Sequence, residues 1–318
     1  MVSLCLRLRL ARGSHKTYGG HQDLFLAFCD ALKLDPFTVS EDELCMVGAY
    51  FSLSHTVNSL DSFMSAVQSM WNDAGAGELP RGARYVLFKR GLKRLLGPAD
   101  EVVPMVALGV DELGEILSSL DASRPEQARF GAQTAVAFYL ALRTEDHTDG
   151  RLRWGDVFPQ RDGSVQFLLP PGKSVRRYRR VAIAPKAGVL DALTWLRKLA
   201  AFTDAVDRAD DRPLFVSFGP RTTVGLRRPL SRSEFMLQFK QAVRGVLGRD
   251  PVLYAGYSLR RGGVTEMLMA GVPVPIIKRH VGWAPGSEAV NGYYDHAGRF
   301  QMLMPTEAMG SRARACPP

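Results

Sequence analysis

The segment spanning residues 257–296 constrains the fold more than any other part of this chain. It reads YSLRRGGVTEMLMAGVPVPIIKRHVGWAPGSEAVNGYYDH, and its apolar residues recur at helical spacing. Gly271 and Pro273 end a first short helix, because glycine favours the left-handed C-terminal position and proline cannot continue a helix. Gly282 ends a second short helix, and a third carries two adjacent tyrosines. The segment therefore predicts a compact group of three short helices.

These helices bring together side chains of different chemistry. Arg260 and Arg261 open the first helix, Trp283 follows the second, and Tyr293 and Tyr294 lie on the third. A guanidinium matches two phosphate oxygens at once, and a tyrosine hydroxyl is both a phosphate ligand and a potential nucleophile. The same spacing also fits a helical hairpin whose arginine pairs with a carboxylate and whose aromatic rings fill the core. Spacing alone leaves both interpretations open.

Charge points to a polyanionic partner. The 318 residues include 41 Lys and Arg against 32 Asp and Glu, a net charge of +9, which suits nucleic acid or a membrane surface. No apolar run approaches the ~18 to 20 residues of a membrane span, so nucleic acid is favoured. Four scattered cysteines without a C-x-x-C spacing indicate neither a zinc site nor a disulfide framework, and favour an intracellular protein, nuclear in a eukaryote and otherwise cytoplasmic or nucleoid-associated. The cysteines are Cys5, Cys29, Cys45 and Cys316.

The N-terminal part predicts a helical domain. Residues 1–13 alternate apolar and basic side chains, which fits a basic arm, and also a short mitochondrial transit peptide or the start of a longer chain. Residues 14–97 show four stretches of helical periodicity. Ser40 and Glu43 form a capping box at the start of the second stretch. The fourth stretch carries five cations without an acid among them, which fits either a solvated helix face or a surface that follows DNA phosphates. They are Arg84, Lys89, Arg90, Lys93 and Arg94.

Glycine and proline between residues 98 and 110 indicate a linker, after which residues 111–318 form a second domain. Two apolar stretches, 165–169 and 181–183, predict strands on either side of a basic hairpin turn. Helical spacing continues over 188–202, and a second capping box begins at Ser231. The basic turn suits contacts to a DNA backbone through Arg176, Arg177, Arg179 and Arg180.

Taken together, several motifs resemble the C-terminal signature of the tyrosine recombinases, the phage-integrase family. They are Ser-Leu-Arg-Arg-Gly-Gly at 258–263, Ala-Gly-Val-Pro at 270–273, Gly-Trp at 282–283 and a tyrosine about ten residues later. The sequence Gly-Tyr-Ser-Leu-Arg-Arg-Gly-Gly around Arg260 is similar to that in the recombinases of DIRS-like retrotransposons and related mobile elements. The resemblance implies a mainly α fold: a SAM-like helical core-binding domain, then a mixed α+β catalytic domain with a small antiparallel sheet.

The resemblance also implies site-specific cutting and rejoining of double-stranded DNA through a 3′-phosphotyrosine, without a metal or cofactor. Arg143, followed by Asp146 and a Leu-x-Trp-x-Asp segment, matches the first catalytic arginine at a helix end, and Arg260 matches the second. Lys173, just after the first strand, matches the lysine that protonates the leaving oxygen. Trp283 matches the position of a phosphate-binding His or Trp. A homotetramer on two DNA sites is implied in the same way.

Two adjacent tyrosines compete for the role of nucleophile. Tyr294 begins a Tyr-Asp-His sequence similar to the one that follows many family nucleophiles, and it is the first choice. Tyr293 lies nearer the usual interval from Trp283 and is the fallback. Adjacent residues on a helix point roughly 100° apart, so only one of them can face Arg260.

Tyr257 departs from the family pattern, which has His or Lys three residues before the second arginine. A phenol donates a hydrogen bond to phosphate, but it is neither cationic nor a ready base at neutral pH. Three functions therefore remain open. The chain is an active recombinase or integrase of a mobile element, a non-catalytic DNA-binding relic of such an element, or an enzyme like the type IB topoisomerases.

Overall fold

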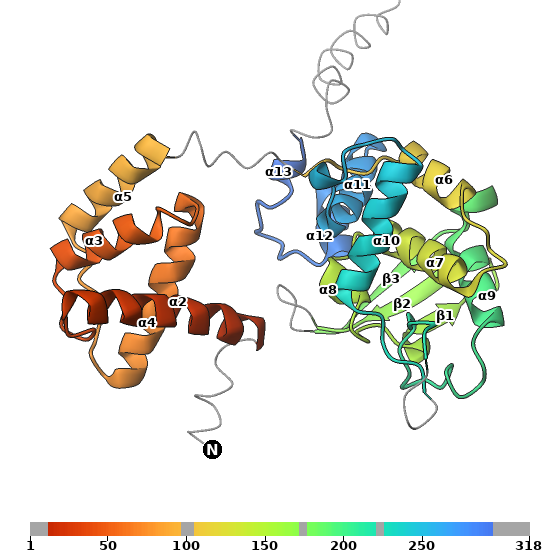
Figure 1. The fold of residues 1–318 in the computed structure, drawn as a ribbon. Coiled ribbons are helices and arrows are strands. Elements are labelled where there is room, and N and C mark those ends of the chain that lie inside the picture. The colour runs from red at the N-terminus through yellow and green to blue at the C-terminus, as the bar shows by residue number, and fades with distance from the viewer. Residues whose placement is uncertain (1–11, 97–104, 172–176, 221–225, 295–318) are drawn as a thin grey trace, which may run out of the picture. The chain divides into compact units, whose positions relative to one another are not determined.

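The computed structural model describes residues 12–96, 105–171, 177–220 and 226–294. The chain divides into two compact units, Met1–Val103 and Pro104–Pro318, and each is described by itself (Figure 1). The division falls inside the 98–110 segment that the sequence suggests as a linker. Across the described ranges, no helix is both long and apolar enough to span a membrane.

The first unit is a bundle of helices, as the periodicity predicts. A core that contains Phe25, Leu44, Phe63 and Trp71 holds it together. The predicted capping box is present: the Ser40 backbone N–H donates to Glu43 Oε2 at 2.7 Å, and the Glu43 N–H donates to Ser40 Oγ. Its elements are α2 (Arg12–Leu32), α3 (Glu41–Phe51), the 3-10 turn η1 (Val57–Ser59), α4 (Leu60–Ala74) and α5 (Ala83–Leu96).

The second unit combines helices with one small sheet, which confirms the predicted mixed architecture (Figure 1). Helices α7 and α9 pack against each other, and α11 packs against α7, α12 and α13. The helices are α6 (Val110–Ser118), α7 (Pro125–Tyr139), α8 (Thr144–His147), α9 (Ala192–Ala201), α10 (Arg232–Gly245), α11 (Gly256–Met269), α12 (Val274–Val281) and α13 (Asn291–Tyr294); the 3-10 turns are η2 (Trp154–Asp156), η3 (Gly188–Leu190) and η4 (Pro251–Leu253).

The sheet has the order β1-β2-β3 and is antiparallel throughout. Strands β2 (Val165–Leu169) and β3 (Arg179–Ile183) confirm the two predicted apolar strands, and Leu169 pairs with Arg179 at the hairpin end. Strand β1 (Val157–Pro159) was not expected, because three residues ending in proline carry almost no pattern. Alternate side chains of β2 and β3 enter the core of the unit.

Two segments differ in detail from the sequence prediction. The helix expected over 188–202 is divided at Asp191, whose carboxylate caps α9 by accepting from the Thr194 N–H at 2.8 Å. Residues 105–110, at the end of the suggested linker, lie against the second unit: the Leu108 N–H donates to the Ser258 carbonyl at 3.1 Å, and Leu108 is fully buried. At the other end of the chain, Arg12 and Gly13 of the suggested arm belong to α2, and residues 1–11 lie outside the described ranges.

Candidate active site

Helix α11 carries the central residue of the site, Arg260. The Ala255 N–H donates to Ser258 Oγ at 3.0 Å, which closes the first turn of the helix. Arg260 is only 1% exposed, whereas Tyr257, one turn earlier, is 42% exposed. The beginning of α11 therefore joins a buried cation to a phenol that reaches solvent.

Two glycines let α11 approach its neighbours closely. A Cβ on Gly262 would lie 1.8 Å from the Leu108 carbonyl oxygen, and one on Gly263 would lie 2.2 Å from that of Phe138. No side chain fits at either position, so α11 lies directly against the backbone of α7 and of the segment before α6. This approach brings Arg260 Nη1 within 2.7 Å of the Ala141 carbonyl, which accepts its hydrogen bond.

Arg143 begins a new helix, whereas the sequence placed it at the end of one. Helix α7 stops at Tyr139, Ala141 has a positive φ of 47°, and Arg143 is the N-terminal cap residue of α8. The Arg143 N–H donates to Asp146 Oδ2 at 3.0 Å, which explains the acid three residues later as part of a cap. Burial chiefly, and the nearby charge of Arg143 in addition, lower the pKa of Arg260.

Trp283 and Tyr293 complete the surroundings of Arg260. The Arg260 guanidinium carbon lies 5.4 Å from the centroid of the Trp283 ring, and the Trp283 and Tyr293 rings are 5.2 Å apart. Trp283 is 9% exposed and Tyr293 is 4% exposed. Gly282, with a φ of 78°, ends α12 as predicted and turns the chain toward Trp283. The structure therefore brings Arg143, Arg260, Trp283 and Tyr293 together.

The Tyr293 hydroxyl forms a hydrogen bond with the Tyr257 hydroxyl. Burial, followed by this hydrogen bond, raises the pKa of Tyr293 well above its usual value, and the charge of Arg260 acts in the opposite direction. Only the backbone of Tyr294 lies within the described part of the chain, as the last residue of α13. Within that part, Tyr293 is the tyrosine of the pair whose hydroxyl lies in the site.

The basic residues of the hairpin between β2 and β3 differ in their exposure and contacts. Lys173 and Arg176 lie outside the described residues, and Arg177 and Arg180 are exposed, as a DNA-contacting turn requires. Arg179 instead turns into the protein and donates from Nη1 to the His280 carbonyl. Sequence reasoning grouped Arg179 with its exposed neighbours. The alternation of β3, which buries every second residue, was the signal that could have separated them.

The basic face of α5 is partly neutralised within its own unit. Arg84 Nε lies 2.7 Å from an Asp42 carboxylate oxygen, and Lys89 Nζ lies 2.5 Å from one of Asp61. The other three predicted cations are exposed and have no ion-pair partner among the described residues. These are Arg90, Lys93 and Arg94.

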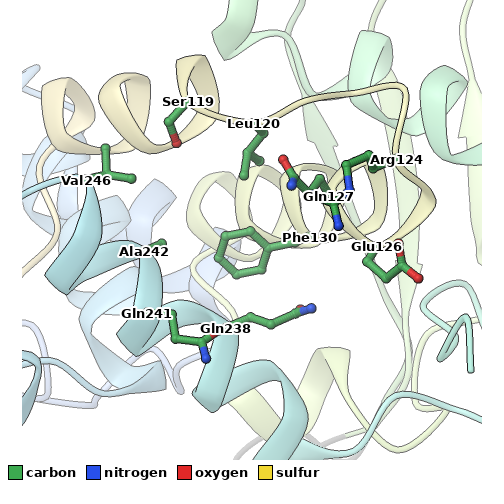
Figure 2. Close-up of a pocket in the computed structure, with 10 residues that line it drawn as sticks. All are labelled: Ser119, Leu120, Arg124, Glu126, Gln127, Phe130, Gln238, Gln241, Ala242 and Val246. Carbon is green, nitrogen blue, oxygen red and sulfur yellow. The ribbon is translucent and has the colours of Figure 1, made fainter.

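A separate cavity of about 460 Å³ lies among α6, α7 and α10. Figure 2 shows Phe130 at its centre, with Leu120 above it, Ala242 to its left and Gln238 below. None of the residues predicted for catalysis or DNA binding lines it. Among the described residues, no group of three or more His, Cys, Asp or Glu side chains could hold a metal ion.

The architecture is that of a two-unit protein in which a helical bundle precedes a mixed unit with a three-stranded sheet and an arginine-rich site at three C-terminal helices. Comparison with solved structures identifies proteins that have this architecture. A lambda integrase dimer bound to a COC′ core site is 16% identical, with a TM-score of 0.61 over 92% of this chain and 75% of that one. The XerH site-specific recombinase bound to a palindromic difH substrate is 15% identical, with a TM-score of 0.59 over 85% and 72%.

The Tn1549 transposon integrase in complex with circular intermediate DNA is 12% identical, with a TM-score of 0.54 over 83% of this chain and 85% of that one. No protein-family model matches the sequence, and no curated protein matches it either. The chain therefore has the fold of the tyrosine recombinases, the family that its motifs resemble.

Proposed function

We propose that the protein is a DNA strand-transferase that cuts and rejoins double-stranded DNA through a 3′-phosphotyrosine, with Tyr293 as the nucleophile. One observation carries the proposal. Arg260 is buried beside Tyr293, and its Nε and Nη2 atoms have no hydrogen-bond partner within the described structure. A buried guanidinium with unused donors is costly unless an anion binds it, and a phosphodiester supplies the matching oxygens.

The reaction follows from these groups. The Tyr293 oxygen attacks the phosphorus, the bond from phosphorus to the 5′ oxygen breaks, and the proton of the phenol is lost while the leaving 5′ oxygen gains one. Arg143 and Arg260 hold the non-bridging oxygens as charge develops on them, and the Trp283 indole N–H donates to the same phosphate. Lys173 is the proposed acid for the leaving oxygen, as the family resemblance implies. A 5′-hydroxyl of a second strand reverses the step, so rejoining needs no ATP.

The proton of Tyr293 has a short route to solvent. Tyr293 is 4% exposed, its neighbour Arg260 can only donate hydrogen bonds, and the half-exposed Tyr257 hydroxyl can both accept and donate. We therefore assign Tyr257 the role of passing this proton to water. Tyr257→Phe removes the hydroxyl alone and should slow cleavage about 100-fold, within the range of general acid–base effects.

Substrate and assembly follow from the comparisons as proposals. The lambda integrase dimer is described as bound to a COC′ core site, XerH as bound to a palindromic difH substrate, and the Tn1549 integrase as in complex with circular intermediate DNA. Another lambda integrase structure is a tetramer bound to a Holliday junction. We propose that this chain likewise acts as a homotetramer on two DNA sites, as the recombinase of a mobile element.

Covalent trapping tests the proposal. DNA fragments from the flanks of the protein's own gene are nicked beside successive phosphates, so that the short 5′-hydroxyl piece diffuses away after cleavage and rejoining is prevented. Wild type and Tyr294→Phe should give a DNA-shifted band that survives SDS, and Tyr293→Phe should give none. An adduct lost in Tyr294→Phe alone would move the nucleophile to Tyr294.

A second candidate, a DNA-binding relic without catalysis, is favoured by one observation. Tyr257 puts a neutral hydroxyl against Tyr293 where the family resemblance leads us to expect a cation. For this candidate, the nicked substrate is bound tightly without an adduct, and Tyr257→His restores adduct formation. The alternative of a type IB topoisomerase is distinguished by relaxation of supercoiled DNA without exchange of strands between duplexes.

A further inference from the structure

Arg179 and Arg180 are adjacent in β3 but face opposite ways. Val181 and Ile183 enter the core of the unit, while Arg180 and Ala182 are exposed. Because successive side chains of a strand point to opposite faces, Arg179 belongs to the inward face with Val181. Arg180 remains on the outer face, where a DNA backbone can reach it.

Arg179 reaches the helix end that presents Trp283. Its Nη1 donates to the carbonyl of His280, in the last turn of α12. The His280 ring forms a hydrogen bond through Nε2 with the Tyr139 carbonyl at 2.8 Å, and the Trp283 N–H donates to the Lys278 carbonyl at 2.8 Å. A cation at a helix C-terminus is favourable, so Arg179 fixes the turn from which the Trp283 ring extends toward Arg260.

Among the residues that the structure describes, the arginines around Arg260 outnumber the carboxylates. Burial lowers the pKa of Arg179 to about 10, and the charges of Arg260 and Arg143 add to this, while the Asp146 carboxylate acts against it. Arg179 therefore stays cationic at neutral pH. One Asp146 oxygen already accepts from the Arg143 backbone N–H. Three guanidinium groups and one carboxylate favour an incoming anion.

We propose that Arg179 is a third guanidinium of the phosphate site, which holds the end of α12 through one N–H group and offers its remaining N–H groups to the substrate phosphate. Among the described residues, Arg179 makes a hydrogen bond through Nη1 alone, and its side chain is only partly buried. The inference deepens the proposed function and rests on it. It also distinguishes Arg179 from the exposed arginines of the hairpin.

Arg161→Ala is the control, since it removes an exposed arginine from the same sheet, in the turn between β1 and β2. Arg179→Ala should lower the rate of adduct formation on the nicked DNA about 100-fold, the size expected for one lost donor to a developing charge. Arg161→Ala should leave this rate near wild type, whereas Arg180→Ala, which removes a proposed backbone contact, should weaken DNA binding and reduce its salt slope by about one. The proposal is overturned if Arg179→Ala reduces the salt slope as Arg180→Ala does and retains the wild-type rate.

A neutral substrate distinguishes a phosphate ligand from a purely structural residue. Replacing one non-bridging oxygen at the scissile phosphate by methyl removes the charge that Arg179 would hold. The rate penalty of Arg179→Ala should then shrink at least tenfold, and Arg179→Lys, which keeps the charge, should lie between wild type and Arg179→Ala on the charged substrate. An equal penalty on both substrates would mean that Arg179 acts on α12 alone and would contradict the proposal.

Anion binding can be measured without DNA, so it tests the role of Arg179 independently of the proposed strand-transfer reaction. Orthovanadate should raise the melting temperature of wild type and Arg161→Ala equally, and that of Arg179→Ala much less, since ligand stabilisation follows site affinity. Such a result supports the anion site even if no covalent adduct forms. Equal stabilisation of all three proteins would overturn the role of Arg179 whether or not the strand-transfer proposal holds.

Discussion

At the scale of single residues, Arg260 decides what the site can do. Its guanidinium is buried and bound on one side by the Ala141 carbonyl, and it is left with donors that no described group satisfies. The sequence predicted Arg260, Arg143 and Trp283 as members of one site, and the structure brings them together. It did not predict that Arg143 caps α8 or that Arg179 joins them, because both depend on where α7 and α12 end.

Arg260→Lys should reduce the rate of adduct formation by about 10²- to 10³-fold, because an ammonium cannot bind two phosphate oxygens in the geometry of a guanidinium. DNA affinity should remain close to wild type. Arg197→Lys is the control, since it makes the same substitution at an exposed arginine of α9. Trapping assays and filter binding measure the two quantities. A wild-type rate in Arg260→Lys would remove Arg260 from the mechanism.

His147 should make the stability of the second unit depend on pH. It lies buried in α8, where Gln133 Nε2 lies 3.1 Å from its Nδ1, and burial lowers its pKa to about 3. The unfolded chain binds this proton near pH 6.5 and the folded protein does not, so stability falls as pH drops from about 6.5 toward 3, by up to about 1.4 kcal/mol per pH unit.

His147→Gln removes this titration and should flatten the dependence. Urea unfolding at pH 7.0, 6.0 and 5.0 measures the effect in both proteins. An unchanged slope in His147→Gln would mean that other groups carry the acid sensitivity.

At the scale of elements, glycine contacts of α11 set the geometry of the site. Periodicity predicted the helices, and their caps predicted several of the ends. Periodicity could not predict the approach of α11 to α7, because the contact of Gly262 and Gly263 with backbone carbonyls joins segments far apart in the chain. Periodicity could not predict short elements such as β1 and α8 either, because three or four residues are too few to show a repeating pattern.

Gly262→Ala should destabilise the second unit by about 3 kcal/mol or more and lower adduct formation, because the new methyl group meets the Leu108 carbonyl at 1.8 Å. Gly91→Ala, in α5 with nothing near its Cβ position, is the control, and it should stabilise its helix by up to about 1 kcal/mol. Chemical denaturation measures both changes. Equal stability of Gly262→Ala and wild type would contradict the close packing.

Helix α5 should contribute to DNA affinity through its unpaired cations. Replacing Arg90, Lys93 and Arg94 by alanine should reduce the salt slope of binding by about three, one for each lost phosphate contact. The double variant of Arg84 and Lys89, which pair with Asp42 and Asp61, should have a smaller effect for each charge removed. Affinity measured between 50 and 200 mM salt would test this. Equal effects for each charge would mean that DNA displaces the carboxylates.

At the scale of the whole molecule, the chain consists of two units with separate cores. The sequence suggests a linker at 98–110, because glycine and proline interrupt two long series of helical periods, and the boundary between the two units lies within that segment. The apolar pattern also indicated two strands of the second unit, and the family resemblance implied its mixed α+β character. The sequence favoured Tyr294 through its Tyr-Asp-His context and kept Tyr293 for its interval from Trp283. It could not show that α13 packs against α11 with the Tyr293 ring 5.2 Å from that of Trp283, which is the reason that we propose Tyr293.

Mass spectrometry of the trapped adduct identifies the residue that carries the DNA after cleavage. The trapped adduct is digested with nuclease and trypsin, and the peptide that spans residues 280–299 is fragmented in a mass spectrometer, because both tyrosines lie in it. We predict a 3′-phosphonucleotide on Tyr293, lost in Tyr293→Phe and present in Tyr294→Phe. A nucleotide on Tyr294, or strand cleavage by Tyr293→Phe at the wild-type rate, would contradict the account.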